Sequence, residues 1–309
     1  MSTLLILDTP AISDFDLSSF AEWLLINGKR GGHSKKSIKA YCSDLHGFIQ
    51  WFPVHTGQQF APELVIAPDL RAYDHFSNEI QHVRAATWNR RFAALAAFFQ
   101  FATQQKLIIS NPFDKSGLRT RSIQEAPPKS LNKSDYARVL RVVEQSINLA
   151  RTGNQRRMAI RNRAMFALMN YAGVRVGELC ALRPANLLLS DRKGRVDIEH
   201  GKGNKEADVP LAREARLAVS EWLQINSDEV LFDGLTERQV QRIIADIGQR
   251  AGVKLTPHVL RHTFVYRTLE ITGGNLVMTQ ELARHNRADQ TAHYAKPHQE
   301  DKERAVENL

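Results

Sequence analysis

A histidine and an arginine three residues apart, followed later by a tyrosine, carry the most informative chemistry in this chain. Thr256 can cap a helix with Pro257 at its first position, so that His258 and Arg261 lie one turn apart on the same face. An imidazole and a guanidinium in that arrangement can hold two oxygens of one phosphate. Tyr294, further along the chain, is then a candidate nucleophile toward the phosphorus atom.

The pair alone is weak, because a chain of this composition contains such a His-x-x-Arg spacing about once by chance. A site that holds a phosphate needs further cations, and Arg175 is the first candidate. It follows a predicted helix that ends at Gly173, and Glu178 stands one turn beyond it. A carboxylate in that place can fix a guanidinium in one orientation. The alternative is a surface arginine at a helix start with an ordinary glutamate neighbour.

Lys202 and His285 complete the candidate set. Lys202 lies in the turn Gly201-Lys202-Gly203, and a lysine with an ordinary pKa of ~10.4 is a proton donor at neutral pH. A solvated lysine in an ordinary hairpin turn is the alternative. His285 is expected at the end of a helix that begins near Asn275. Tyr294 follows nine residues later, and a phenol with an ordinary pKa of ~10 needs a base or nearby cations to attack.

The second part of the chain must position these residues. An Asn132 cap predicts a helix start, and the apolar spacing predicts further helices over 155–171, 212–224, 236–251, 257–270 and 276–284. Between the first two of these further helices, the spacing of apolar residues changes to the two-residue period of β-strands. Three short strands are predicted over 187–190, 195–199 and 207–210, with turns at 191–194 and 201–204.

The first part of the chain reads as helical throughout. One apolar stripe runs from Ser37, a second helix is predicted from Asp69 as N-cap, and a third from about Thr87. The residues expected on the buried faces of these helices are Ile38, Tyr41, Leu45, Phe48, Phe52, Leu70, Tyr73, Phe76, Ile80, Trp88, Phe92, Leu95, Phe99 and Ala102.

Basic residues gather at the start of the third helix, where they oppose the helix dipole. They are Arg84, Arg90 and Arg91. Contact with phosphates explains their placement, and a solvated charge cluster explains it equally well. Residues 115–130 lose all apolar periodicity and are predicted to be a basic linker.

The composition of the chain limits the number of domains and the classes of partner that are expected. The 309 residues are 43% apolar, enough for two domains, and the net charge is +9 with both parts of the chain positive. Such a charge suits a polyanion, although a merely basic soluble protein is the alternative. The two cysteines, Cys42 and Cys180, favour a reduced cytoplasmic setting. The sequence predicts no signal peptide and no segment that spans a membrane.

Taken together, the motifs resemble the tyrosine recombinase (phage-integrase-like) family, of the simple two-domain Xer-like type. The matches occur in the family's order, and Ser34 to Phe52 also resembles its helical core-binding domain. The matching segments are Gly173-Val174-Arg175-Val176-Gly177-Glu178-Leu179, Gly201-Lys202-Gly203-Asn204-Lys205 leading to Val209-Pro210-Leu211, Thr256-Pro257-His258-Val259-Leu260-Arg261-His262-Thr263, and His285 with Tyr294.

The resemblance implies a role for each catalytic position. Arg175, Arg261 and His285 would bind the scissile phosphate, and Tyr294 would attack it to form a 3′-phosphotyrosyl bond. Lys202 would protonate the leaving 5′-oxygen, and His258 would assist proton transfer at the tyrosine. No metal and no cofactor would be required. Two alternatives are kept: a type IB topoisomerase-like enzyme that relaxes DNA, and a non-catalytic DNA-binding protein of the same fold.

The resemblance also implies an architecture and partners. The fold would be mainly α with a small antiparallel β-sheet in the second domain: a core-binding domain over 1–114, a linker over 115–130 and a catalytic domain over 131–309. The two domains would clamp double-stranded DNA, as a homo-tetramer of two dimers on paired sites, with accessory proteins as further partners. The residues expected to contact DNA are Lys35, Lys36, Lys39, Arg84, Arg90, Arg91, Arg119 and Arg121.

Two departures from the family pattern stand out. The family usually has Leu-Gly-His before the last histidine, whereas this chain has Leu282-Ala283-Arg284-His285. Arg284 at a glycine position is expected either to alter how the tyrosine segment docks or to add a phosphate contact. The second departure is that no segment suited to a separate arm-site-binding domain precedes the core-binding domain.

Overall fold

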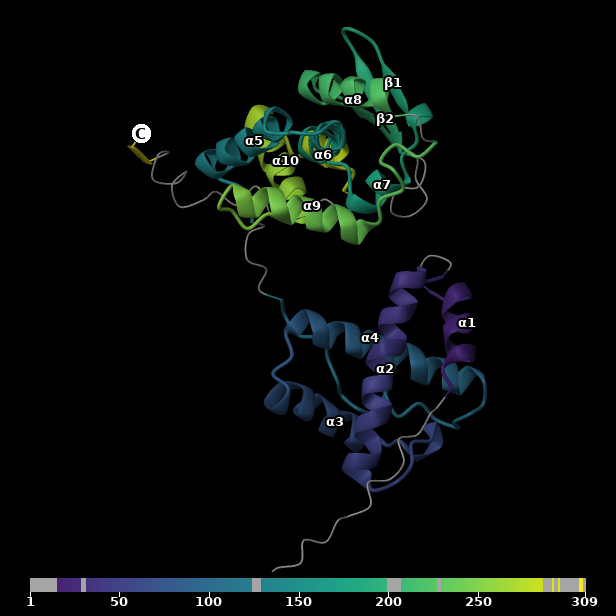
Figure 1. Cartoon of the computed structure of the whole chain (residues 1–309). Helices are drawn as coiled ribbons and strands as arrows, with labels where there is room; N and C mark the ends of the chain where they lie inside the picture. Colours follow the sequence, from purple (N-terminus) through teal and green to yellow (C-terminus); the bar gives the residue numbers. More distant parts are fainter. Residues whose placement is uncertain are drawn as a thin grey trace, which may run out of the picture. The chain divides into compact units, whose positions relative to one another are not determined.

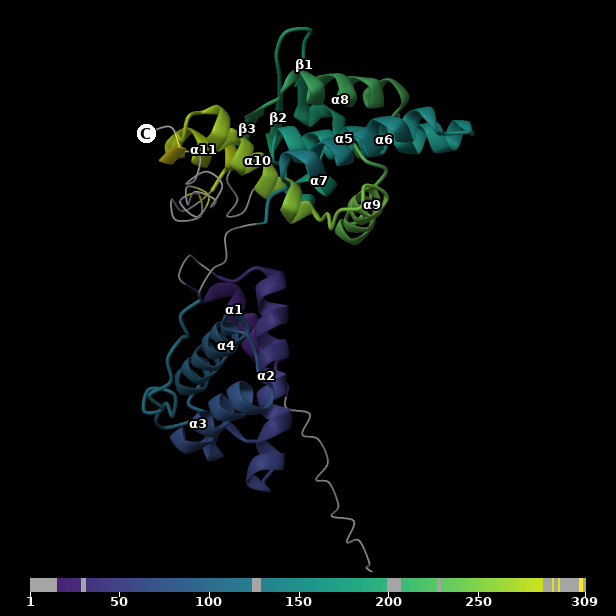
Figure 2. The same ribbon diagram turned by 90° about the vertical axis from the view of Figure 1, so that its left-hand side faces the viewer.

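The computed structural model describes residues 16–28, 32–123, 129–198, 207–226, 229–285, 291, 294 and 306–307 (Figures 1 and 2). The chain divides into two compact units, Met1–Glu125 and Ala126–Leu309. Each has its own apolar core. In the part of the chain that the structure describes, no helix has the length and apolar character needed to cross a bilayer.

The first unit is a helical bundle with an aromatic core. Its four α-helices are α1 (Ser18–Ile26), α2 (Lys35–Thr56), α3 (Ala67–His75) and α4 (Ala85–Gln104), with short helical turns at Pro62–Leu64 and Phe76–Ile80. In Figure 1, α1 runs beside the long α2, and α4 crosses α2. Phe48 of α2 and Phe98 and Phe99 of α4 are fully buried where these helices meet, and Phe60 and Tyr73 pack edge-on against Phe48.

The helix starts differ slightly from those predicted. α2 is capped by Ser34, whose Oγ accepts from the Ser37 amide at 3.2 Å, so the helix begins two residues before Ser37. Asp69 lies within the first turn of α3 and accepts from the Ile66 amide at 3.0 Å, instead of being the N-cap. Ile80 was predicted to be buried, and this is wrong, since it is 65% exposed. The π-turn over Phe76–Ile80 breaks the 3.6-residue period on which the prediction rested.

Part of the predicted linker is bound to α4. Trp88 Nε1 donates to the carbonyl of Arg119 at 3.1 Å, and Asn89 exchanges two hydrogen bonds with the backbone of Arg121. The Arg121 guanidinium stacks 4.7 Å from the Trp88 ring and pairs with Asp74 at 2.5 Å. These bonds satisfy a buried indole N–H and hold residues 119–121 against the first unit.

The second unit is built around one buried helix. Its elements are α5 (Lys133–Asn148), α6 (Gly153–Tyr171), α7 (Val176–Ala181), the short 3-10 turn Pro184–Asn186, α8 (Arg213–Ile225), α9 (Glu237–Arg250), α10 (Pro257–Ile271) and α11 (Leu276–Ala283). α6 is apolar on nearly every side over its second half, as expected for a helix enclosed by others. It contacts α5, α8 and α10. In both views α8 lies on one side of α6 and α9 on the other.

A small sheet adjoins α8 in this unit. Its strands are β1 (Leu187–Leu189), β2 (Gly194–Ile198) and β3 (Ala207–Pro210), antiparallel in the order β1-β2-β3. Val196 of the central strand is paired with Leu187 on one side and Val209 on the other, and all three side chains are buried. The predicted class, mainly α with a small antiparallel sheet in the second domain, is confirmed. The predicted turn over 201–204, with Lys202, lies outside the described residues.

Candidate active site

The start of α10 forms as the sequence predicts. Thr256 Oγ1 accepts from the Val259 amide at 3.2 Å, and Pro257 occupies the first helical position. This cap fixes the direction of the helix and therefore of the side chains in its first turns. Arg261 is buried at 8% exposure, whereas His258, one turn earlier, is exposed.

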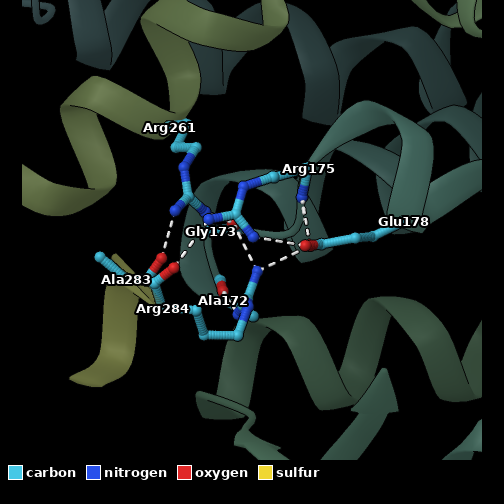
Figure 3. A network of polar contacts seen from close by, with 7 residues as sticks. All are labelled: Ala172, Gly173, Arg175, Glu178, Arg261, Ala283 and Arg284. Atoms are coloured by element: carbon cyan, nitrogen blue, oxygen red, sulfur yellow. Dashed lines mark hydrogen bonds and ion pairs between the residues drawn. The ribbon is translucent and has the colours of Figure 1, made fainter. Parts of the chain in front are cut away.

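Arg261 is anchored by two backbone carbonyls from opposite sides of the site. Its guanidinium donates to the carbonyl of Gly173, just after α6, and to that of Ala283, the last residue of α11 (Figure 3). Gly173 has a φ of +59°, and a Cβ there would stand 2.5 Å from the ring of Phe264. Only glycine therefore lets the chain turn here and present its carbonyl to Arg261.

Arg175 is held by the glutamate that the sequence indicated. Its Nη1 donates to Glu178 Oε1 at 2.5 Å, and its backbone N–H donates to Glu178 Oε2 at 2.9 Å. The predicted pairing of Arg175 with Glu178 is thus confirmed. Nη2 of Arg175 makes a further bond, to the carbonyl of Arg284 at 2.8 Å. Like Arg261, Arg175 therefore binds a carbonyl at the end of α11.

Arg284 adds a third guanidinium that turns inward. Its Nη2 lies 2.8 Å from Glu178 Oε2 and 3.0 Å from the carbonyl of Gly173, and its Nη1 lies 3.3 Å from the carbonyl of Ala172. The residue itself adopts the left-handed conformation, with φ +53°. These contacts are made by a side chain that glycine lacks, and the effect of Arg284 on docking or on phosphate binding stays a prediction.

The helix before His285 ends one residue earlier than predicted, at Ala283. Arg284 in the left-handed conformation terminates α11, and the amide of His285 donates back to the carbonyl of Gln280 at 3.1 Å. This is the usual hydrogen-bond pattern of a helix that ends in a left-handed residue. His285 is consequently fixed in a turn just beyond the helix.

Among the residues that the structure describes, the three guanidinium groups face a single carboxylate, so this part of the site carries an excess of positive charge. Burial, followed by repulsion from Arg175 and Arg284, lowers the pKa of Arg261 to about 9, which leaves it a cation at neutral pH. Burial alone would raise the pKa of Glu178. Arg284 and then the hydrogen bonds from Arg175 outweigh it, and the pKa lies below its ordinary value. A buried cation excess of this kind favours the binding of an anion.

Tyr294 lies against two histidines. It is 9% exposed, its ring centroid is 6.3 Å from that of His285 and 5.6 Å from that of His262, and its hydroxyl is hydrogen-bonded to Nδ1 of His262. Nδ1 of His285 is bonded to Thr291 Oγ1 at 2.9 Å. His262 is part of the motif matched in the sequence, but no role was predicted for it. Its position four residues after His258, on the same helical face, was the available signal.

The aromatic groups of the site are uncharged at neutral pH. Burial raises the pKa of Tyr294 to about 12, an effect that Arg261 only partly opposes. Burial, with added repulsion from His258 and Arg261, lowers the pKa of His262 to about 4. Burial, with added repulsion from Arg261 and Arg175, lowers that of His285 to about 4 as well. The phenol therefore keeps its proton, and both imidazoles have a free lone pair.

The cations expected to contact DNA fall into two groups. Arg90 pairs with Asp44 at 2.6 Å while its side chain stays 48% exposed, and Arg91 donates to Ser77 and Gln81. Arg121 is paired as described above. The other five are exposed: Lys35, Lys36 and Lys39 in the first turns of α2, Arg84 just before α4, and Arg119.

Replacing Arg284 with glycine tests the weight of the network. Glycine removes about 1 kcal/mol of left-handed backbone strain, but the buried Glu178 loses a cationic partner, which costs about 3 kcal/mol. We expect Arg284→Gly to lower the free energy of unfolding by about 2 kcal/mol in urea denaturation. Arg284→Lys keeps the charge without the forked donors, so its free energy of unfolding should lie between those of the parent and Arg284→Gly. A glycine variant as stable as the parent would contradict this view of the network.

The two depressed histidine pKa values make stability depend on pH. In the unfolded chain these imidazoles are protonated near their ordinary pKa of 6.5. In the folded chain they are protonated only near a pKa of about 4. The free energy of unfolding should therefore fall as the pH is lowered from 6.5 toward 4. The double variant His262→Gln/His285→Gln should show a shallower fall in urea denaturation across this window. An unchanged slope would show that these groups titrate normally.

Comparison with known proteins shows the family of this chain. The Phage integrase family model matches residues 132–301, and the Phage integrase N-terminal SAM-like domain matches residues 17–106. Tyrosine recombinase XerC of Bacillus licheniformis is 28% identical over an alignment of 296 residues that covers 90% of this chain and 90% of its own. Tyrosine recombinase XerA of Pyrococcus furiosus is 27% identical over 91% of this chain and 88% of its own, and XerC of Vibrio cholerae is 30% identical over 69% and 68%.

Solved structures share the fold. The XerH recombinase in a post-cleavage complex with palindromic difH substrate has a TM-score of 0.69 at 19% identity, over 88% of this chain and 79% of its own. A lambda integrase(75–356) dimer bound to a COC′ core site has a TM-score of 0.66 at 17% identity, over 90% and 93%. On the family match and the relatives, this chain belongs to the phage integrase family and is a site-specific tyrosine recombinase of the Xer type.

Proposed function

We propose that this recombinase cuts and rejoins DNA through Tyr294. The phenol oxygen bonds to the scissile phosphorus, the bond from phosphorus to the 5′-oxygen breaks, and a 3′-phosphotyrosyl link forms. The 5′-hydroxyl of a partner strand then attacks that link and releases the tyrosine. One phosphodiester replaces another at each exchange, so the reaction needs no nucleotide to supply energy.

The observation that carries the proposal is the shared anchoring of Arg175 and Arg261. Both donate to carbonyls at the end of α11, Arg284 and Ala283 respectively, and His285 follows directly in the chain. Two guanidiniums and an imidazole are therefore preorganised together, which suits the charge that builds up on a pentavalent phosphorane. We assign phosphate binding to Arg175, Arg261 and His285.

Two proton-transfer roles complete the proposed mechanism. Lys202, in the segment between β2 and β3, is assigned to protonate the leaving 5′-oxygen. His258 is assigned to assist proton transfer at the tyrosine. Its exposure on α10, one turn from the buried Arg261, supports a group that meets incoming DNA.

Double-stranded DNA is the proposed partner of both units, and the DNA-bound XerH and lambda integrase structures support it. Exposed cations at the start of α2, together with Arg84 and Arg119, are the simplest phosphate contacts. Arg90, Arg91 and Arg121 would share their donors with the groups that they already bind. A homo-tetramer of two dimers in the cytoplasm, assisted by accessory proteins, would supply one tyrosine for each of the four strands exchanged.

The nucleophile is tested by Tyr294→Phe on a nicked suicide substrate, from which the product strand escapes and the covalent complex accumulates. The parent should give a slow-migrating protein–DNA band under denaturing conditions, and Tyr294→Phe should bind the DNA but give none. Tyr266→Phe, a tyrosine change on neighbouring α10, is the matched control and should retain the band. A covalent band from Tyr294→Phe would refute the assignment. A parent that binds but never gives a band would favour a non-catalytic protein.

The role of the α2 lysines is tested by the salt dependence of binding. Each phosphate contact contributes about −0.9 to the slope of log affinity against log salt. The triple variant Lys35→Gln/Lys36→Gln/Lys39→Gln should therefore lose up to about three units of slope in fluorescence anisotropy titrations. Lys106→Gln, beyond the end of α4, serves as the comparison within the same unit. A triple variant with the parental slope would remove these lysines from the interface.

A further inference from the structure

The hydroxyl of Tyr294 has a histidine partner in this structure. Tyr294 Oη is hydrogen-bonded to Nδ1 of His262, a histidine in the second turn of α10. Tyr294 is buried and His262 is partly buried, so this contact lies largely within the protein. His262 is therefore placed to take the phenol proton.

The neighbouring histidines are less suited to that task. His285 stacks on the Tyr294 ring, and its Nδ1 is engaged with Thr291. His258 is exposed, and its ring centroid lies 6.4 Å from that of His262. His262 thus stands between His258 and the phenol, and it is the histidine that meets the reacting oxygen.

The protonation states allow the phenol to be the donor of this hydrogen bond. His262 is neutral at pH 7, because burial, followed by repulsion from His258 and Arg261, lowers its pKa to about 4. The phenol of Tyr294 keeps its proton in the same buried setting. In the tautomer of neutral His262 that carries its proton on Nε2, Tyr294 donates and Nδ1 accepts, which is the arrangement that a general base needs before the reaction.

DNA binding would shift this balance toward proton transfer. A phosphate held by Arg175 and Arg261 brings negative charge to the cations that depress the pKa of His262, so an imidazolium there becomes easier to form. At the same time, the phenol oxygen becomes more acidic as it bonds to phosphorus. Besides burial, repulsion from Arg175 lowers the pKa values of His285 and Arg284, so a bound phosphate would raise these pKa values as well.

We propose that His262 is the general base for Tyr294, an inference that rests on the proposed role of Tyr294 as nucleophile. As the phenol oxygen bonds to phosphorus, its proton passes to Nδ1 of His262. The bond from phosphorus to the 5′-oxygen breaks, and that oxygen takes a proton from Lys202. In rejoining, the 5′-hydroxyl attacks and gives up its proton, the bond from tyrosine to phosphorus breaks, and His262 returns a proton to the phenol oxygen.

The first test measures single-turnover cleavage of the nicked suicide substrate by His262→Ala and His262→Gln. We expect the cleavage rate to fall about 10²- to 10⁴-fold, the usual range for loss of a general base, with DNA affinity little changed. Glu270→Gln, an exposed position on the same helix, is the control and should cleave like the parent. Urea denaturation of each variant confirms that it is folded.

A second measurement separates proton removal from positioning. Incorporation of a fluorinated tyrosine at position 294 gives a more acidic phenol, which needs a base less. The gap between the parent and His262→Ala should narrow with this residue if His262 removes the proton. An equal gap with both phenols would assign His262 to positioning alone and overturn the proposal.

A third measurement distinguishes His262 from the acid. A substrate with sulfur in place of the bridging 5′-oxygen has a leaving group that needs no proton. It should restore cleavage to Lys202→Ala and leave His262→Ala slow. Rescue of His262→Ala by this substrate would place His262 on the leaving-group side, against the proposal.

The outcomes also separate this inference from the proposed function. If the parent and His262→Ala both form the Tyr294 adduct at the same rate, His262 is not the base and the nucleophile stands. A faster His262→Ala would make the contact inhibitory, which also overturns the inference. If the parent forms no adduct, or forms it at another residue, the proposed function itself fails.

Discussion

The buried carboxylate of Glu178 is the group on which the rest of the site depends. It accepts from Arg175 and Arg284 at once, and it is 8% exposed. Without it, these guanidiniums and Arg261 would repel one another in a poorly solvated space. In the described part of the site, one negative charge stands against three positive ones, so the cluster holds together and keeps an excess of positive charge. On the proposed function, the same contact stabilises the cluster and leaves that charge for a phosphate.

The arginines of this cluster also fix the position of the chain at the end of α11. The last carbonyls of a helix lack partners within it and carry partial negative charge. Here the carbonyls of Ala283 and Arg284 accept from Arg261 and Arg175. The groups assigned to phosphate binding are therefore the groups that hold the chain leading to His285. A displacement of either arginine would therefore move both the proposed phosphate-binding groups and the turn that follows α11.

The sequence was sufficient for features set by local rules and insufficient for those set by distant contacts. The Thr256 cap and the pairing of Arg175 with Glu178 were predictable, because each depends on residues within one helical turn. Ile80 was misplaced because a π-turn changes the period, and no local signal announces it. The inward turn of Arg284 joins residues 106 positions apart. The contact of His262 with Tyr294 was not predicted for the same reason, since the two residues lie 32 positions apart.

The neutral state of the site has a functional meaning of its own. A tyrosine with a pKa near 12 is a poor nucleophile, and a histidine with a pKa near 4 is a weak base. Both shifts come mainly from burial, with repulsion from His258 and Arg261 added at His262. Phosphate charge beside Arg261 would relax that repulsion and strengthen His262 as a base. On the proposed mechanism, bound phosphate would therefore assist the step in which the phenol loses its proton.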